Sequence, residues 1–312
     1  MPQAASYKGF SIQSHTASPR LKVVILDAAT ISAFHASTQQ WGVQALEYKP
    51  FLRFAIANQL NQCCGGQLQD QLQNIIHDRA SGAFMLQFES GKQEDAAEQD
   101  RDTDFYVKLS TAVSHLIGLS NFDSMGGKYY ARFTVKNDDN SDSYLRQAHR
   151  RMELHNDGTY VNERTDYVLM MKMAEKNMEG GNSLILHLED WQDLDTFVND
   201  PVSQQDIEWS APPSKQVQGK VYHPVFFEKD EQGLPHMLFI DQFANPKNMQ
   251  QGLYLNKMGE SLEAEKNCIS VPVPVGSMLV IHNHRWLHGR EQFMSNPGLE
   301  RELLRQRGHF TE

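Results

Sequence analysis

The distribution of apolar residues changes near residue 128, and this change most limits the folds open to the chain. Before this point, apolar residues recur at helical spacing in 44–79 and again in 106–116. Beyond it, short segments such as 129–136 alternate between apolar and polar residues, which is typical of half-buried strands. Helices followed by many short strands predict a β-sandwich or jelly roll with helices packed on its outside.

We therefore predict a mainly β fold with flanking helices, a double-stranded β-helix (jelly roll). A single domain is expected to span 1–312, with helical elements concentrated in roughly 44–118. The polar residues 1–20 predict an arm, and 91–103 and 137–143 predict loops. Further strands are expected at 21–26, 167–173, 180–188, 237–241, 269–275, 278–282 and 302–310, and a short helix at 190–197.

The helical part is expected to face the core through two apolar stripes separated by a Gly65-Gly66 break. The residues of the first stripe are Phe51, Phe54 and Ile56, and those of the second are Leu68, Leu72 and Ile75. A later helix is expected to present Tyr106, Leu109, Val113 and Leu116 on one face.

Composition narrows the partners and the compartment. The net charge of −10 and the isoelectric point near 5.7 argue against nucleic acid or an anionic membrane as a partner. No apolar run approaches the roughly 18 residues that span a bilayer, and the N-terminus lacks the pattern of an export signal. Three cysteines, two of them adjacent, suit reduced thiols rather than disulfides or zinc ligands. A cytoplasmic location is therefore expected.

The first chemical motif is His155-Asn-Asp157. Side chains two residues apart on an extended backbone point to the same face, so this motif can deliver an imidazole and a carboxylate to one point. His288, in the segment 283–290, is the candidate third ligand. Two histidines and one carboxylate with open positions opposite are the ligand set of non-haem Fe(II) oxygenases. The alternative is that His155 is an ordinary hydrogen-bonded residue.

Two open positions on such a metal can take a bidentate 2-oxo acid, whose far carboxylate then needs a cation. Guanidinium groups suit this task, and Arg301, Arg305 and Arg307 share one face of the predicted last strand. Ser183, after a Gly-Gly turn, is a candidate hydroxyl for the same carboxylate. The alternatives are a solvated edge strand and a serine that merely begins a strand.

Most other histidines lack a partner at ligand spacing. We expect six of them to be ordinary packing or surface residues, namely His35, His77, His115, His187, His223 and His236.

The order of these motifs resembles the Fe(II)/2-oxoglutarate-dependent oxygenases of the taurine dioxygenase and clavaminate synthase type. Within that group, longer runs from about residue 40 onward resemble the glutarate 2-hydroxylases, the carbon-starvation-induced dioxygenases of bacterial lysine catabolism. These runs are 43–49, 120–123, 129–133, 140–146, 152–160, 166–172, 211–215, 271–275 and 286–290. One departure is that the family carries a short tail past the arginine strand, whereas this chain stops at Glu312, so contacts of that tail are expected to be missing.

The resemblance implies Fe(II) bound by His155, Asp157 and His288, with 2-oxoglutarate and dioxygen as co-substrates. It implies that Arg305, Ser183 and Arg301 bind 2-oxoglutarate and that Arg307 and Arg305 bind the substrate. The implied reaction converts glutarate, a small dicarboxylate, to (S)-2-hydroxyglutarate with release of succinate and carbon dioxide. The resemblance also implies a homo-oligomer, expected to be a tetramer. Asn283 and Tyr144 are candidate supports for the ligands or the substrate.

Other functions stay open at the level of the sequence. The same family type includes hydroxylases of free amino acids. A zinc-dependent hydrolase can use the same three ligands with a bound water, although it leaves the arginine strand without a role. A jelly-roll binding module without turnover is the third alternative.

Overall fold

The computed structural model describes residues 4–88, 99–124, 126–136, 150–211, 219–294 and 296–311, with the backbone alone at 99–102. Two β-sheets face each other and enclose an apolar layer that contains Leu21, Val168, Ile185 and Leu279. Members of this layer alternate along their strands with residues of the outer faces, as expected for strands buried on both sides. The predicted jelly roll is confirmed.

The major sheet has nine strands in the described part of the chain, in the order β1-β2-β3-β4-β16-β8-β18-β5, with β6 also pairing β18. Neighbouring strands are antiparallel except β3 and β4, which are parallel. The bounds are β1 Ala5–Tyr7, β2 Phe10–His15, β3 Ser18–Leu26, β4 Ala83–Phe88, β5 Leu119–Ser120, β6 Ala131–Lys136, β8 Tyr167–Lys176, β16 Met278–His282 and β18 Glu300–His309.

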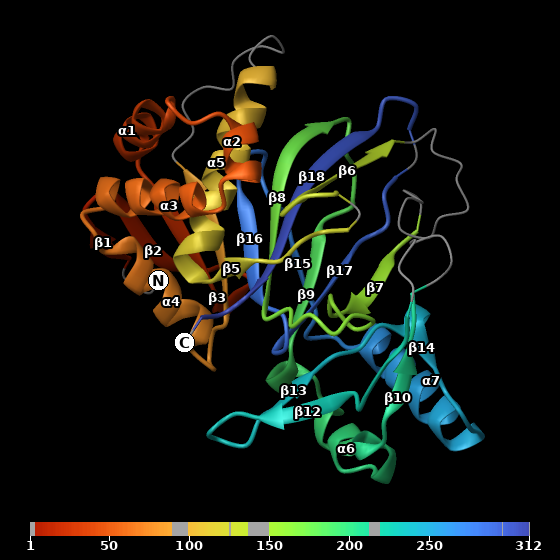
Figure 1. Cartoon of the computed structure of the whole chain (residues 1–312). Helices are drawn as coiled ribbons and strands as arrows, with labels where there is room; N and C mark the ends of the chain where they lie inside the picture. The colour runs from red at the N-terminus through yellow and green to blue at the C-terminus, as the bar shows by residue number, and fades with distance from the viewer. Residues whose placement is uncertain are drawn as a thin grey trace.

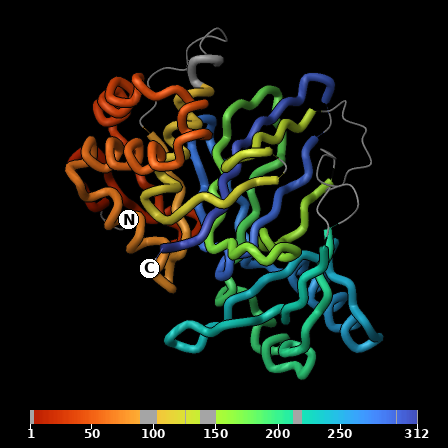
Figure 2. The backbone as a smooth tube through the Cα atoms, in the orientation of Figure 1, coloured from red at the N-terminus to blue at the C-terminus, as the bar shows by residue number. Residues whose placement is uncertain are grey.

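The minor sheet is antiparallel, with the order β15-β9-β17-β7. Its strands are β7 Met152–His155, β9 Ser183–His187, β15 Ile269–Val271 and β17 Trp286–Arg290. In Figure 2 the blue C-terminal strand β18 lies beside the green strand β8, which brings the arginine strand into the centre of the fold.

Five helices pack together on the outer face of the major sheet (Figure 1). Leu60, Leu72 and Val113 lie in one core with Leu169 and Val280 of the sheet, which fixes the helical layer against the strands. The helices are α1 Ala28–Thr38, α2 Val43–Tyr48, α3 Phe51–Cys63, α4 Leu68–His77 and α5 Gln99–Ile117.

A second group of elements covers the outer face of the minor sheet (Figure 1). Leu186 and Leu287 of that sheet pack there with Trp209, Phe239 and Met258. The elements are α6 Leu194–Val198, α7 Met249–Ala264, β10 Ile207–Trp209, β11 Val221–His223, β12 Phe226–Lys229, β13 Pro235–Met237 and β14 Ala244–Asn245, with short 3₁₀ turns at Leu188–Asp190, Pro201–Gln204 and Asp241–Phe243.

The predicted N-terminal arm is wrong for residues 5–20. These residues form β1, β2 and the start of β3 at one edge of the major sheet. Phe10 is buried, and Gly9 adopts a positive φ of 83° that permits the turn between the first two strands. Because most residues of β1 and β2 are exposed or only partly buried, their polar composition did not indicate strands.

The first predicted helical stripe is also wrong in part. Phe51 and Phe54 are 67% and 51% exposed, whereas Ile56 is buried together with Ala57 and Leu60. The face of α3 that packs against the core therefore includes Ile56 but not Phe51 or Phe54, which lie on the solvent-exposed side of the helix. The second stripe, the Gly65-Gly66 break and the later helical face are confirmed.

Helical segments extend beyond the predicted range 44–118. Both α1 and α7 lie outside it, and α2 and α3 are separate helices with Pro50 between them. The segment 99–103 was expected to be a loop, but α5 begins at Gln99. Its apolar pattern starts only at Phe105, so the polar first turn gave no periodic signal. The loop predicted at 137–143 lies outside the described residues.

The strand predicted at 237–241 is wrong beyond its first residue, because β13 spans Pro235–Met237 and 238–241 form no strand. Leu238 donates its backbone N–H to the carbonyl of Val225, and Phe239 donates to the side chain of Asn156. The peptide groups are thus satisfied by a loop and a side chain instead of a strand ladder. The three cysteines are free, and no helix in the described ranges is long and apolar enough to cross a bilayer.

Buried histidines make the fold sensitive to acid. His115, His187 and His236 are less than 10% exposed, and burial lowers the pKa of His115 and His236 to about 4 and that of His187 to about 3. Unfolded imidazoles titrate near pH 6.5, so below that pH the unfolded state binds protons that the folded state does not. We expect the free energy of unfolding to fall by about 1.4 kcal/mol per pH unit for each such histidine.

Urea unfolding between pH 7 and pH 5 tests this expectation. The variant His115→Gln should show a shallower loss of stability with falling pH than the wild type. The exposed His35 provides the control, since His35→Gln should keep the wild-type slope. If stability fell with pH equally in the wild type and in both variants, buried His115 would not be a source of the acid sensitivity.

Candidate metal centre and acid-binding site

Two side chains of the minor sheet and one from the turn after β7 converge on one point. His155 ends β7 and is paired across the strands with His288 of β17, and the two ring centroids are 4.3 Å apart. Asp157 Oδ1 lies 3.8 Å from His155 Nε2 and 4.0 Å from His288 Nε2. One ligand atom of each residue lies within 4.8 Å of the others, and all three residues are buried. Two imidazoles and a carboxylate in this arrangement fit Fe(II).

Asp157 reaches this point from a turn, not from the extended backbone that its spacing predicted. The strand ends at His155, and Asp157 and Gly158 follow in a turn. Gly158 has a φ of 86°, and a Cβ there would lie 2.6 Å from Thr165 Oγ1. The turn therefore requires glycine after the ligand.

Two asparagines hold this turn in place. Asn283 Oδ1 accepts a hydrogen bond from the Asp157 backbone N–H at 2.9 Å, and its Nδ2 donates to the carbonyls of Asp157 at 2.9 Å and Thr165 at 2.8 Å. Asn156 donates to the carbonyls of Asn283 and Trp286. Asn283 thus holds the turn that carries Asp157, and its support of a bound metal stays a prediction. The other predicted support, Tyr144, lies outside the described residues.

The variant Asn283→Ala should bind Fe(II) about 10- to 100-fold more weakly, since it removes three hydrogen bonds that fix a ligand. Anaerobic metal titration measures this change. Asn267 also donates its amide to a backbone carbonyl, that of Asp190, but lies on the surface. Asn267→Ala should therefore keep the wild-type affinity, and an unchanged affinity in Asn283→Ala would refute the supporting role.

The protonation states of the site suit metal binding. Burial alone would raise the pKa of Asp157, but Arg305, Arg307 and the two imidazoles hold it well below its ordinary value. Burial and the neighbouring His155 lower the pKa of His288 to about 3. The carboxylate is thus ionised and the imidazole neutral, which are the forms that bind metals. His155 Nδ1 lies 2.8 Å from the Glu153 carbonyl, which leaves Nε2 for the metal.

The predicted arginine face on β18 is confirmed as a face. Leu304 and Gln306 point to the helical layer, where Gln306 donates to Ser110 of α5. The alternate residues point to the minor sheet, and Arg305 Nη1 donates to Asp157 Oδ2 at 3.0 Å. Arg305 is therefore adjacent to the metal ligands, and this strand is not a solvated edge.

Arg305 and Arg307 form one cation group on this face. A second cation group lies nearer the start of β18. Arg301 is 5% exposed and shares the ring of Phe293 with Arg290, at 5.7 and 4.8 Å from the ring centroid. Within the described ranges, no carboxylate lies within ion-pair distance of Arg301 and its Nε has no hydrogen-bond partner. Burial, with Arg290 second, lowers the pKa of Arg301 to about 9. Such a buried cation is suited to an anionic ligand.

Two further residues belong to this group. Lys172 of β8 is 3% exposed, is paired with Glu175 and lies close enough to Arg301 for repulsion to lower its pKa, although burial is the larger cause. Ser183 begins β9 after the Gly-Gly turn and is paired in register with Arg290. Opposite residues of an antiparallel pair present their side chains on one face, so the Ser183 hydroxyl lies beside this cation group.

The sequence prediction missed four residues of the site. Arg290 and Asn156 stand inside quoted motifs but had no role assigned. Lys172 and Asp123 end two of the runs that carry the family resemblance, 166–172 and 120–123, but no role was assigned to them either. Apart from these runs, their sequence signal is a charged or amide group placed among apolar neighbours.

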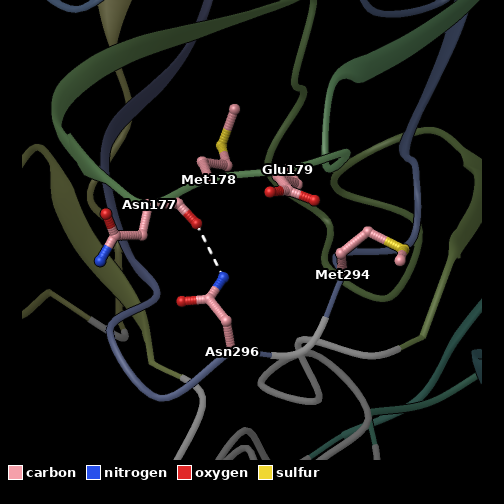
Figure 3. A pocket seen from close by; sticks show the side chains of 5 residues that line it. All are labelled: Asn177, Met178, Glu179, Met294 and Asn296. Carbon is pink, nitrogen blue, oxygen red and sulfur yellow. Dashed lines mark hydrogen bonds between the residues drawn. The ribbon is translucent and has the colours of Figure 1, made fainter.

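A hollow of about 480 Å³ lies near the turn between β8 and β9 rather than at the metal ligands (Figure 3). It is lined by Asn177, Met178, Glu179, Met294 and Asn296, and Asn296 Nδ2 donates to the Asn177 carbonyl at 2.8 Å. Its described lining residues include one carboxylate and no cation, a lining that does not favour an acidic substrate.

Comparison with known proteins assigns the family. Residues 10–310 match the family model described as CsiD. The chain belongs to the CsiD family. This CsiD protein is 54% identical to the glutarate 2-hydroxylase of Klebsiella pneumoniae (strain 342) over 310 residues, which cover 99% of the chain and 93% of the relative. It is 53% identical to the glutarate 2-hydroxylase of Salmonella typhimurium (strain LT2) over 308 residues, with the same coverage.

Solved structures of iron oxygenases share the fold of this CsiD protein. Asparagine oxygenase, in complex with Fe(II), 3-hydroxyasparagine and succinate, aligns with a TM-score of 0.71 at 15% identity over 91% of this chain and 92% of that one. The non-haem iron oxygenase OrfP, in complex with Fe and alpha-ketoglutaric acid, aligns with a TM-score of 0.64 at 16% identity over 91% and 93%. At these identities the likeness supports the fold alone.

Proposed function

We propose that this CsiD protein is an Fe(II)/2-oxoglutarate-dependent dioxygenase that hydroxylates glutarate. The reaction converts glutarate, 2-oxoglutarate and dioxygen to (S)-2-hydroxyglutarate, succinate and carbon dioxide, as its 54% identity to a glutarate 2-hydroxylase supports. The observation that carries the proposal is the pair of buried cation groups on one face of β18, beside the His155, Asp157 and His288 cluster.

We assign the two acids to the two cation groups. Arg301, with Ser183 nearby, receives the far carboxylate of 2-oxoglutarate, because the described residues give Arg301 no carboxylate of its own. Arg307 receives a carboxylate of glutarate. Arg305 lies between Arg301 and Arg307 along β18 and beside Asp157, so it serves both acids.

The charges of the site agree with two dianionic ligands. Among the residues that the structure describes, the cations are Arg290, Arg301, Arg305, Arg307 and Lys172, and the carboxylates are Asp123, Asp157 and Glu175. With a divalent ion added, seven positive charges stand against three negative ones. The excess of four equals the charge of one 2-oxoglutarate and one glutarate, and buried charges need this balance.

Fe(II), when bound, supplies the redox chemistry that activates dioxygen, using electrons from decarboxylation of the 2-oxo acid. The chain's own residues bind and orient. His155, Asp157 and His288 are each less than 10% exposed and keep the metal positions away from bulk water. The arginine face of β18 fixes one end of glutarate, so that one methylene group is presented to the metal.

Turnover of 2-oxoglutarate with glutarate, lysine and arginine in turn tests the substrate. We expect glutarate alone to stimulate succinate formation strongly, because a second carboxylate can meet Arg307 where an ammonium group would be repelled. Stimulation by an amino acid, with none by glutarate, would favour the amino-acid hydroxylase. Turnover without oxygen or 2-oxoglutarate would favour the zinc hydrolase. The absence of any turnover would favour a binding module.

We also infer a cytoplasmic homo-oligomer, expected to be a tetramer. Its support is an apolar surface on α2 and α3, where Tyr48, Phe51 and Phe54 are 76%, 67% and 51% exposed. Light scattering should give a mass of four chains, and Phe51→Ser should shift it toward smaller species. A wild-type mass of one chain would refute the oligomer.

A further inference from the structure

Asp123 is a carboxylate at 2% exposure in the segment between β5 and β6. Its backbone N–H donates to the Lys128 carbonyl at 2.7 Å, and its carbonyl accepts from the Gly127 N–H at 2.8 Å. A Cβ at Gly126 would lie 2.2 Å from the Tyr130 carbonyl oxygen, so the turn is tight. Backbone hydrogen bonds on both sides thus hold the main chain of Asp123.

The two oxygens of this carboxylate have different tasks. Oδ1 accepts the Gly126 backbone N–H at 3.3 Å, which fixes the plane of the group. Oδ2 accepts Arg305 Nη2 at 3.0 Å and lies 3.3 Å from Arg307 Nη2. One oxygen thus joins the carboxylate to the backbone, and the other joins the two guanidinium groups to each other.

Arg305 is fixed from three sides as a result. Its guanidinium lies 4.8 Å from the ring centroid of Phe133, donates one Nη to Asp157 and donates the other to Asp123. Without Asp123, the guanidinium keeps its link to the metal ligand and loses the one that directs it toward Arg307. Arg307 loses the only ion-pair partner that the described residues give it.

The net charge of Asp123, Arg305 and Arg307 also suits the binding of a carboxylate. Burial alone would raise the pKa of Asp123, but Arg305 and Arg307 hold it below its ordinary value, so the group is ionised. Two guanidinium groups and one carboxylate leave a single positive charge at this end of the site. That charge matches one carboxylate of a bound acid, whereas two unneutralised cations would repel each other.

We propose that Asp123 is a positioning residue for the substrate: it holds Arg305 and Arg307 in the orientation that receives one carboxylate of glutarate. The assignment rests on the proposed function. It predicts that loss of Asp123 weakens glutarate binding while the 2-oxoglutarate end, which centres on Arg301, is little affected.

The test compares Asp123→Asn with the wild type. This substitution keeps the size of the side chain and one acceptor oxygen but removes the charge. We expect the KM for glutarate, and the Kd from anaerobic calorimetry on the Fe(II)/2-oxoglutarate protein, to rise at least about tenfold, since misplaced binding groups cost up to about a hundredfold. The Kd of 2-oxoglutarate, read from the absorbance of its Fe(II) complex, should rise clearly less than the Kd of glutarate, because Arg301 and Ser183 keep their positions and only the contribution of Arg305 changes.

A second readout separates positioning from structure. Glutarate that is poorly oriented leaves 2-oxoglutarate turnover uncoupled, so the ratio of 2-hydroxyglutarate to succinate should fall in Asp123→Asn. The longer acid of Asp123→Glu restores the charge and should recover part of the ratio. A merely destabilised protein would instead lose both products in parallel.

Asp230 provides a matched control. It also lies in a turn, accepts backbone N–H groups from Gln232 and Leu234 and lies near two arginines, Arg79 and Arg285. Asp230→Asn should keep the wild-type KM, Kd and product ratio. An unchanged KM and product ratio in Asp123→Asn would overturn the inference alone, whereas a wild type that forms no 2-hydroxyglutarate would overturn the proposed function and the inference with it.

Discussion

Asp157→Ala should reduce succinate formation from 2-oxoglutarate and glutarate to background. Asp157 supplies the only carboxylate of the three-ligand cluster, and its other oxygen holds Arg305. Removal leaves two histidines and an arginine that keeps its bond to Asp123 but loses its link to the metal ligands. Fe(II) affinity should fall by more than the roughly 100-fold typical of losing a residue that only supports a ligand.

The measurements are Fe(II) titration and succinate assay. Asp195→Ala, on the exposed side of α6, is the control and should behave as wild type. Circular dichroism should show that both variants are folded. Retained succinate formation in Asp157→Ala would exclude Asp157 as a ligand.

Arg301→Met should weaken 2-oxoglutarate binding and stabilise the ligand-free fold at the same time. Loss of a buried charge-assisted pair costs about 2 to 5 kcal/mol, which corresponds to a Kd raised about 30-fold or more. In the ligand-free protein the guanidinium is buried beside Arg290, with its pKa lowered to about 9. An apolar side chain there should raise the free energy of unfolding by about 1 kcal/mol or more.

The opposite signs of the two effects make this prediction specific. Calorimetric titration of 2-oxoglutarate and urea unfolding measure them separately. Arg132 of β6 is more exposed and is paired with Glu302, so Arg132→Met should change neither quantity appreciably. A variant Arg301→Met that is less stable and binds 2-oxoglutarate normally would show that Arg301 is a structural residue.

The sequence predicted those parts of the site that depend on short-range periodicity. Parity along the last strand placed Arg301, Arg305 and Arg307 on one face. The register with β6 is continuous from Glu300 to Arg305, and the register with β8 is continuous from Leu303 to Gly308. The pairing of His155 with His288 could be proposed only from ligand chemistry, since nothing local in the sequence sets the register of distant strands. The two histidines do lie opposite each other on β7 and β17.

Other features depend on tertiary contacts that leave no periodic signal. Asp123 is recognisable only once β18 brings two arginines to the turn before β6. Phe51 and Phe54 have apolar spacing but lie on the far side of α3. Helix α7 does carry buried Tyr254, Met258 and Leu262 at helical spacing, but Gly252 and Gly259 weaken its helical propensity.

The central claim is that one buried site couples oxidation of 2-oxoglutarate to hydroxylation of glutarate. The direct test loads the protein with Fe(II) and 2-oxoglutarate without oxygen, then adds isotopically heavy dioxygen with and without glutarate. We predict equal amounts of succinate and 2-hydroxyglutarate when glutarate is present, with one heavy oxygen atom in each. Succinate that forms at the same rate without glutarate, or a 2-hydroxyglutarate that carries no heavy oxygen, would contradict the account.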